Sequence, residues 1–345
     1  MTGLKYSKRN HCDRVASRYI MPLLVGFVTF QAVWLPVMAQ AVRVEESRYA
    51  MGSLYVIEAW GEDRERLQKV LTEALDEVDR LDRLLSHYKS ESELSRVNRE
   101  AWPGPVKADP ELFDLLEASL GYSRASAGAF DITVGPLMRA WGFFRGEGRY
   151  PTDPERLEAR ASIGYRKVRL DRFARTVTFT HRGVEFDLGG IGKGYAVDRA
   201  GVILRRASVN SALISAGGSS ILAIGHPPGQ SAWTVSLQDP YGLGRPVHEV
   251  QLRDEALSVS GSAEKFFVLN GRRYSHIMDP RTGHPVESVL SVAVISQTGT
   301  DGDALDNAFF VLGPGRTRAL KRRYPVREVI FFLPHSTKRW VKVQR

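Results

Sequence analysis

The hydrophobic pattern of the chain changes several times, and each pattern predicts a different element. The side chains of residues 49–60 follow an alternating pattern and are rich in Tyr, Val, Ile and Trp, which predicts a β-strand. Apolar residues then recur every three or four positions from Leu67 to Leu85, which predicts one face of a long helix. Asp109 followed by Pro110 is typical of the start of a second helix.

Strands dominate the pattern after residue 177. Short runs of apolar and β-branched residues predict strands at Trp233–Leu237, Val247–Leu252, Ala256–Ser260, Leu290–Ser296 and Val326–Leu333. One helix is predicted after the glycines near residue 190, and another from about Asp303 to Leu312. Because helices and strands mix without a regular βαβ repeat, the pattern predicts an α+β (mixed α/β) fold rather than a doubly wound sheet.

The first 41 residues differ from the rest. Basic residues come first, an apolar run from Ile20 to Met38 follows, and Ala39-Gln40-Ala41 ends the segment. This order predicts a secretory signal peptide over residues 1–41, followed by a single domain over 42–345 in the periplasm. Proline and glycine interrupt the apolar run, so cleavage is favoured over a retained anchor, which would give inner-membrane association.

The amino-acid composition limits the catalytic groups, metal sites and binding partners that the chain can have. Cys12 is the only cysteine and falls in the signal segment, which excludes cysteine nucleophiles, thiolate zinc sites and iron–sulfur clusters from the remainder. The formal net charge is +9, of which residues 1–41 carry +4, leaving +5. We interpret the basic stretch from Arg316 to Arg345 as a solvated, strand-rich C-terminus and predict no nucleic-acid partner. A mild positive field suits an anionic dinucleotide.

A glycine-rich stretch is the first candidate for a functional site. A predicted strand ends at Asp187, and the glycines from Gly189 to Gly194 then open a helix. Free backbone N–H groups at a helix start favour an anion, and Lys193 adds a full positive charge. The stretch matches neither the dinucleotide-binding GxGxxG motif nor the P-loop. The alternative is a tight turn that only eases the start of the helix.

Two further stretches carry polar candidates. If a helix begins near Asp303, then Asp303 and Asn307 lie four residues apart on one face and offer oxygen ligands for Mg²⁺ or Ca²⁺. By spacing alone, an acidic helix start that complements the helix dipole is the more common explanation. His276 is either a proton shuttle or a structural histidine, and the turn from Asp279 to Gly283 follows it.

Two remaining stretches are ambiguous by themselves. Residues 129–137, followed by Trp141-Gly142-Phe143, hold aromatic side chains that a core also uses. Ser86-His87-Tyr88, together with residues 92–98, reads as a helix end and a polar loop.

Taken in order, these stretches resemble the FAD:protein FMN transferase family, also called the ApbE family. Met51-Gly52-Ser53 resembles the family's first strand motif. The other matching segments, in sequence and spacing, are Ala129–Leu137, Asp187–Tyr195, Ser215–Gly218, Tyr274–Gly283 and Asp303–Gly313. The resemblance covers nearly all of residues 42–345.

The resemblance implies a compact fold of two packed lobes with FAD in the cleft between them. The residues that match the family's FAD contacts are Met51, Tyr88, Ala129, Phe130, Asp131, Asp187, Lys193 and Ile277. The resemblance implies Mg²⁺ held by the backbone carbonyl of Gly190, by Asp303 and by the residue at 307. His276 matches the family's reactive histidine.

Two positions depart from the family pattern. The family usually has Thr where this chain has Asn307, although an amide oxygen can still bind a hard cation. The family's Gly-Gly-Asp reads Gly217-Gly218-Ser219 here, which removes one carboxylate.

The implied reaction is Mg²⁺-dependent transfer of FMN from FAD to a Thr or Ser hydroxyl of an acceptor protein, with release of AMP. His276 or Asp187 would take the hydroxyl proton, and the sequence leaves that choice open. The alternatives are an FAD pyrophosphatase, a non-catalytic periplasmic FAD-binding protein, or a structural partner of a membrane redox complex.

Overall fold

The computed structural model describes residues 41–242, 246–334 and 340–343. The predicted signal peptide therefore lies, up to residue 40, outside the described residues. Within the described ranges, no helix is both long and apolar enough to cross a membrane. These residues belong to one compact unit, and its division into two lobes stays a prediction.

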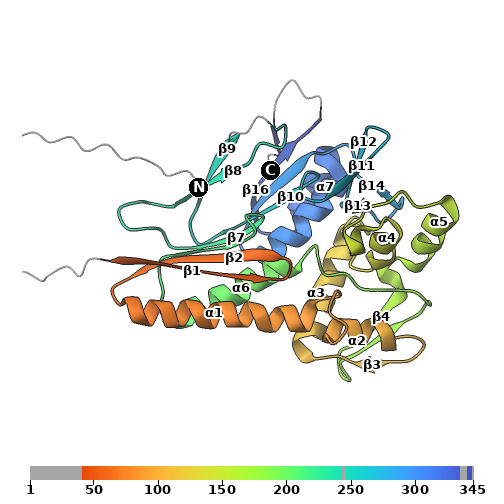
Figure 1. Ribbon diagram of the computed structural model, residues 1–345, viewed down its shortest axis with the longest axis horizontal. Coiled ribbons are helices and arrows are strands. Elements are labelled where there is room, and N and C mark those ends of the chain that lie inside the picture. Colours follow the sequence, from red (N-terminus) through yellow and green to blue (C-terminus); the bar gives the residue numbers. More distant parts are fainter. Residues whose placement is uncertain (1–40, 243–245, 335–339, 344–345) are drawn as a thin grey trace, which may run out of the picture. The chain divides into compact units, whose positions relative to one another are not determined.

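An eight-stranded, wholly antiparallel sheet is the centre of the fold (Figure 1). Its strands follow in the order β1 (Val42–Ala50), β2 (Ser53–Gly61), β6 (Ala212–Ala216), β7 (Ser220–Ile224), β10 (Ala256–Gly261), β15 (Ser291–Ser296), β16 (Val326–Phe332) and β17 (Val341–Lys342). All residues of β15 are buried, because both faces of the sheet are covered there. Val292 and Val294 pack on one side, and Ala293 and Ile295 pack on the other.

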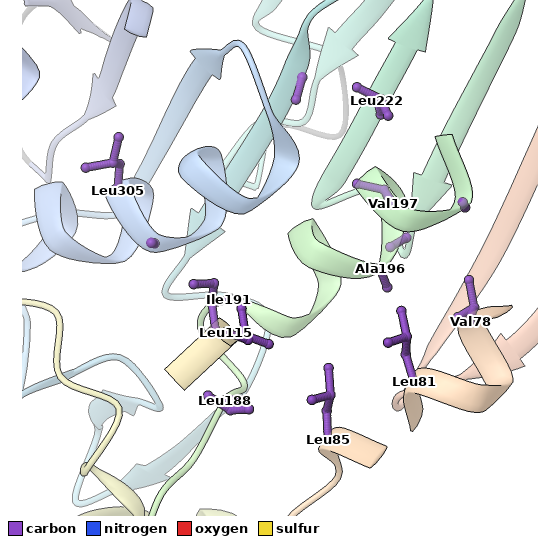
Figure 2. Packing of buried hydrophobic residues seen from close by; sticks show 14 of the residues in the cluster. Val78, Leu81, Leu85, Leu115, Leu188, Ile191, Ala196, Val197, Leu222 and Leu305 are labelled. Carbon is purple, nitrogen blue, oxygen red and sulfur yellow. The ribbon is translucent and has the colours of Figure 1, made fainter. Parts of the chain in front are cut away.

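Three helices cover the first face of the sheet. They are α1 (Arg64–Leu85), α6 (Gly192–Arg206) and α7 (Gly299–Lys321). Figure 1 shows α1 running beside β1 and β2, and Figure 2 shows part of the core that these helices form with the sheet. Leu81 of α1, Val197 of α6 and Leu222 of β7 belong to this one cluster. The opposite face is covered by the hairpin of β8 (Trp233–Leu237) and β9 (His248–Leu252).

The remaining elements, of which α3 is the longest, lie mostly between α1 and α6 in the sequence. They are α2 (Glu93–Glu100), β3 (Val106–Lys107), α3 (Pro110–Ala125), α4 (Gly135–Ala140), η1 (Phe143–Arg145), α5 (Asp153–Ser162), η2 (Tyr165–Lys167), β4 (Val168–Asp171), β5 (Thr176–Phe179), β11 (Phe266–Leu269), β12 (Arg272–Ser275), β13 (Met278–Asp279) and β14 (His284–Pro285). A third apolar cluster joins α4 and α5 to β12 and β13 around the buried Trp141.

The mixed α/β fold, the helix over Leu67–Leu85 and the helix start at Asp109 are confirmed. The Asp109 carboxylate accepts hydrogen bonds from the N–H groups of Glu111 and Leu112, as a helix cap does. The five strands predicted between Trp233 and Leu333 are β8, β9, β10, β15 and β16, each placed to within one residue at either end. The helix after the glycines near residue 190 is α6.

The single strand predicted over residues 49–60 is wrong, because the chain turns there. Ala50 pairs with Ser53, so Met51 and Gly52 form the two-residue turn between β1 and β2. Their φ angles are 50° and 70°, and such turns need positive φ at both positions. The alternating pattern runs across this turn, and Met-Gly lacks the usual Asn-Gly signal, which explains the error. Met51-Gly52 is therefore a turn rather than part of a strand.

Three other local predictions also fail. The segment that ends at Asp187 forms no strand, because the side chain of Asn98 takes both hydrogen bonds of Phe186. Residues 93–100 form helix α2, capped by the Ser92 hydroxyl, rather than a polar loop. The last helix begins at Gly299 instead of Asp303, since Thr298 caps it, and it continues to Lys321 across a non-helical Gly313. The basic C-terminal stretch is therefore partly helical.

Candidate functional site

One large cavity of about 1140 Å³ opens beside the starts of α6 and α7 and the β1–β2 turn. All the site residues predicted from the sequence line it: Met51, Tyr88, Ala129, Phe130, Asp131, Asp187, Gly190, Lys193, His276, Ile277, Asp303 and Asn307. We call this cavity the main cleft. Segments that are far apart in the sequence thus meet at one place, while the role of each side chain stays a prediction.

Asp303 joins three elements in the wall of the main cleft. Its Oδ2 accepts the backbone N–H of Gly194 in the first turn of α6 at 2.6 Å. Its Oδ1 accepts the hydroxyl of Ser220 at the start of β7, also at 2.6 Å. These bonds fix the carboxylate and leave one lone pair on each oxygen for another partner. Sequence reasoning singled out Asp303 but missed Ser220, which lies 83 positions away.

The starts of α6 and α7 approach each other too closely for a side chain at residue 194. A Cβ atom added to Gly194 would lie 2.0 Å from the carbonyl oxygen of Gly299 and 2.9 Å from the Asp303 carboxylate carbon. Glycine is therefore required for a packing reason, and this close approach is what brings the Gly194 N–H to Asp303.

Replacing Gly194 with Ala is expected to lower the free energy of unfolding by about 3 kcal/mol, because the clash involves backbone that cannot move aside. Gly121→Ala in α3 is the matched control, since no heavy atom lies within 4 Å of its Cβ position. That change is expected to stabilise the protein by about 0.5–1 kcal/mol through helix propensity. Denaturant unfolding of both variants checks the difference, and equal effects would contradict the packing argument.

Asn307 follows one turn after Asp303 on α7. Its Nδ2 donates to the Asp303 carbonyl at 2.9 Å and lies 3.4 Å from the carbonyl oxygen of Gly190. The three predicted metal ligands are thus neighbours, and all can offer oxygen, the donor that Mg²⁺ prefers. Among the described residues, no three His, Cys, Asp or Glu side chains gather to hold a metal ion. A cation in this cleft would therefore depend on carbonyl oxygens in addition to Asp303.

Lys193 lines the main cleft together with two acidic residues, Glu264 and Asp306. Burial, followed by the nearby Asp303, raises the pKa of Asp306 well above its usual range. Burial also raises the pKa of Glu264, and the positive charge of Lys193 acts in the opposite direction on both groups. Lys193 therefore lies within electrostatic reach of these acids, where it can balance negative charge on a ligand. Sequence reasoning did not single out Glu264.

His276 is oriented by the loop before β11. Its Nδ1 lies 3.1 Å from the carbonyl oxygen of Lys265, and its backbone N–H donates to the same oxygen. Because a carbonyl only accepts, Nδ1 carries the proton and Nε2 keeps a free lone pair. Burial lowers the pKa of His276 from 6.5 to about 4. The side chain is therefore a neutral base at neutral pH.

Asp187 is another residue that the surrounding chain holds in the wall of the main cleft. Its Oδ1 accepts the N–H of Gly189 at 2.8 Å, and the Nδ1 of His87 lies 3.5 Å from the same oxygen. Two hydrogen bonds between Asn98 and the backbone of Phe186 hold the chain just before it. Both residues lie in the stretch that the sequence analysis interpreted as a helix end and a polar loop, so these two contacts were not predicted.

Tyr88 lines the main cleft close to Asp187 and packs against a second aromatic ring. The Tyr88 ring stacks on Phe144 with centroids 4.9 Å apart, and its side chain remains 55% exposed. Burial and Asp187 raise the pKa of Tyr88 to about 12, so its hydroxyl stays protonated. The exposed ring surface is available for stacking on a planar ligand.

Asp131, predicted to contact FAD, and Ser219, which replaces the family's Asp, both line the main cleft and are both hydrogen-bonded within the protein. The Asp131 carboxylate accepts hydrogen bonds from the N–H and the hydroxyl of Thr133 and from the N–H of Tyr165. These bonds hold the loop around Asp131 together. Ser219 lines the cleft, and its hydroxyl donates to the Ala216 carbonyl at 3.3 Å. The neighbouring Ser220 is the one that contacts Asp303.

Solved structures share this fold over nearly the whole chain. The ApbE protein from Thermotoga maritima superposes with a TM-score of 0.79 at 30% identity, covering 86% of this chain and 97% of that chain. The flavinyl transferase ApbE from Pseudomonas stutzeri gives a TM-score of 0.77 at 28% identity, covering 88% and 95%. Together with the cleft, these neighbours define a transferase enzyme.

The ApbE family model matches residues 51–331, so this chain belongs to the ApbE family. A relative from Treponema pallidum is 36% identical over 281 residues, and the match covers 76% of this chain and 77% of the relative. A relative from Salmonella typhimurium is 31% identical over 293 residues, 82% of each protein. Both relatives are named FAD:protein FMN transferase.

Proposed function

We propose that this enzyme transfers FMN from FAD to a Ser or Thr hydroxyl of an acceptor protein and releases AMP. The observation that carries the proposal is the gathering of a neutral histidine, a lysine and a set of oxygen ligands in one cleft of about 1140 Å³. A cleft of that size accommodates a dinucleotide. The family and the names of the relatives supply the substrate.

We propose that Mg²⁺ assists the reaction, held by the Gly190 carbonyl, the Asp303 carboxylate and the amide oxygen of Asn307. The donor set fits a hard cation because every ligand is oxygen. The Asn307 amide hydrogens now face the Gly190 carbonyl, and rotating the amide by half a turn would present its oxygen there instead. A bound Mg²⁺ would neutralise charge on the phosphates of FAD.

In the reaction the acceptor oxygen would form a bond to the phosphorus on the FMN side, and the bond from that phosphorus to the AMP oxygen would break. The hydroxyl proton would pass to Nε2 of His276, whose other nitrogen is held by the Lys265 carbonyl. Lys193 would balance negative charge that develops on the transferring phosphoryl group. Asp187 would position the substrate, since its Oδ1 already accepts the Gly189 N–H.

The protonation of His276 determines how the rate of FMN transfer should depend on pH. In the free enzyme its pKa is lowered from 6.5 to about 4, so protonation removes the base only near the lower value. Because kcat/KM reports pKa values of the free enzyme, we expect its acid limb near pH 4 rather than pH 6.5. A profile of transfer against pH checks this, and an acid limb at pH 6.5 that persists after His276→Asn would assign the limb to another group.

We also propose that the protein acts in the periplasm. The support is the basic, apolar and Ala-x-Ala sequence of residues 1–41. Expression of the full chain, followed by cell fractionation and N-terminal sequencing of the product, tests export and locates the cleavage point. A full-length cytoplasmic product would contradict the proposal.

The test of function is an incubation of residues 42–345 with FAD, Mg²⁺ and a candidate acceptor domain, with and without EDTA. AMP is followed by chromatography and the acceptor by intact mass. We expect an acceptor heavier by one FMN group, only when metal is present. AMP without labelled acceptor, for every acceptor tried, would identify a pyrophosphatase, and bound FAD without any AMP would identify a flavin carrier.

A further inference from the structure

A second cavity, of about 540 Å³, adjoins the main cleft and shares two wall residues with it, His87 and Tyr88. Its other walls come from α2, from the η1 segment and from residues 182–185. The two cavities therefore lie next to each other, with His87 and Tyr88 in the wall that both share.

Positive charge dominates the second cavity. Arg139 is neutralised by Glu185, to which it donates two hydrogen bonds of 2.7 and 2.6 Å. Arg99 donates to the Ser90 carbonyl at 2.7 Å, and it forms no ion pair with a described carboxylate. Arg182 is exposed and likewise has no carboxylate partner in the described ranges. Two guanidinium groups thus remain uncompensated at the cavity.

Aromatic surface accompanies this charge. Tyr88 stacks on Phe144, the Arg139 guanidinium lies 3.9 Å from the centroid of the same Phe144 ring, and Trp102 is 41% exposed. Arginine with exposed aromatic side chains is the composition enriched in protein-binding surfaces. His87 also lines this cavity, and its Nε2 is buried without a hydrogen-bond partner.

We propose that the second cavity binds the acceptor protein through an extended, acidic segment next to the hydroxyl that is modified. The inference rests on the proposed transferase function, because it assigns the acceptor to a place beside the FAD cleft. Charge complementarity selects the occupant: carboxylates of the segment would pair with Arg99 and Arg182. The hydroxyl would then enter the main cleft past Tyr88.

The test uses two fluorescein-labelled synthetic peptides, each with one central Thr, flanked by Asp in one and by Asn in the other. Fluorescence anisotropy measures binding to the wild type and to the double variant Arg99→Glu/Arg182→Glu. We expect the acidic peptide to bind the wild type about tenfold or more tightly than the Asn peptide, a preference that the double variant loses. Higher salt should reduce the preference as well.

Arg169→Glu/Arg253→Glu is the matched control, since both arginines are exposed, carry the same charge and line neither cavity. It should keep the peptide preference, and FAD affinity should change less than about twofold in both double variants. Equal binding of the two peptides, or a loss of preference in the control, would overturn the proposal. A loss of FAD binding in Arg99→Glu/Arg182→Glu would assign the cavity to FAD. Because binding is read without turnover, failure of acceptor labelling would count against the transferase function alone.

Discussion

Replacing Asp303 with Asn is expected to reduce FMN transfer by about a thousandfold or more, with little loss of folded structure. The carboxylate would be the only charged metal ligand, and a metal ion contributes several kcal/mol to charge stabilisation in such reactions. An amide in its place can still accept the Gly194 N–H, and the Ser220 hydroxyl can accept from the amide instead of donating. The measurement is labelled acceptor over time, alongside thermal unfolding.

Asp301→Asn is the matched control for this variant. Asp301 lies two residues earlier in α7, accepts from the Tyr122 hydroxyl and the Thr298 hydroxyl, and lines no part of the main cleft. It should keep near-normal transfer while losing a comparable amount of stability. If Asp303→Asn transferred FMN at the wild-type rate, Asp303 would have no part in the mechanism.

Replacing His276 with Asn should slow transfer by about a hundredfold or more, if the imidazole takes the hydroxyl proton. The Asn amide reaches the position of Nδ1 and keeps a donor for the Lys265 carbonyl, but it offers no base at the position of Nε2. The orientation of the loop is thus preserved while the lone pair is removed. Initial rates at saturating FAD and acceptor give the comparison.

His276→Gln provides the complementary control, because its longer amide reaches toward the position of Nε2 without being basic. Both variants should bind FAD about as tightly as the wild type, which flavin fluorescence can follow. An effect on the rate below about threefold in His276→Asn would make the histidine structural. The base would then have to be sought elsewhere, with Asp187 as the next candidate.

The sequence predicted those parts of the fold in which hydrophobic pattern and local caps decide the structure. Helix α1 and the strands β8, β9, β10, β15 and β16 bury apolar residues of their own, so the hydrophobic pattern of each segment alone predicts the element. The β1–β2 turn was hidden because alternation continues through Met51. The segment before Asp187 was misjudged because its partner is the side chain of Asn98, 88 positions away.

For the site, the motifs identified the residues that face the cleft, and the structure adds the partners that hold them. Ser220 for Asp303 and the Lys265 carbonyl for His276 follow from tertiary contacts between distant segments. Hydroxyl and carbonyl partners of this kind carry no spacing signal in a sequence. The contact of His87 with Asp187 and the place of Glu264 in the cleft also depend on tertiary structure, and neither was predicted from the sequence.

The contact between the starts of α6 and α7 would also restrict which residues of the proposed metal site can change. Gly194 admits no side chain, and Asp303 is tied to two elements at once, so a change at either position disturbs the framework together with the ligand set. Asn307 contacts the other ligands only through its amide and lies partly exposed one turn further on. If the proposed Mg²⁺ site exists, a change in cation preference would disturb the framework least at position 307, where this chain has Asn.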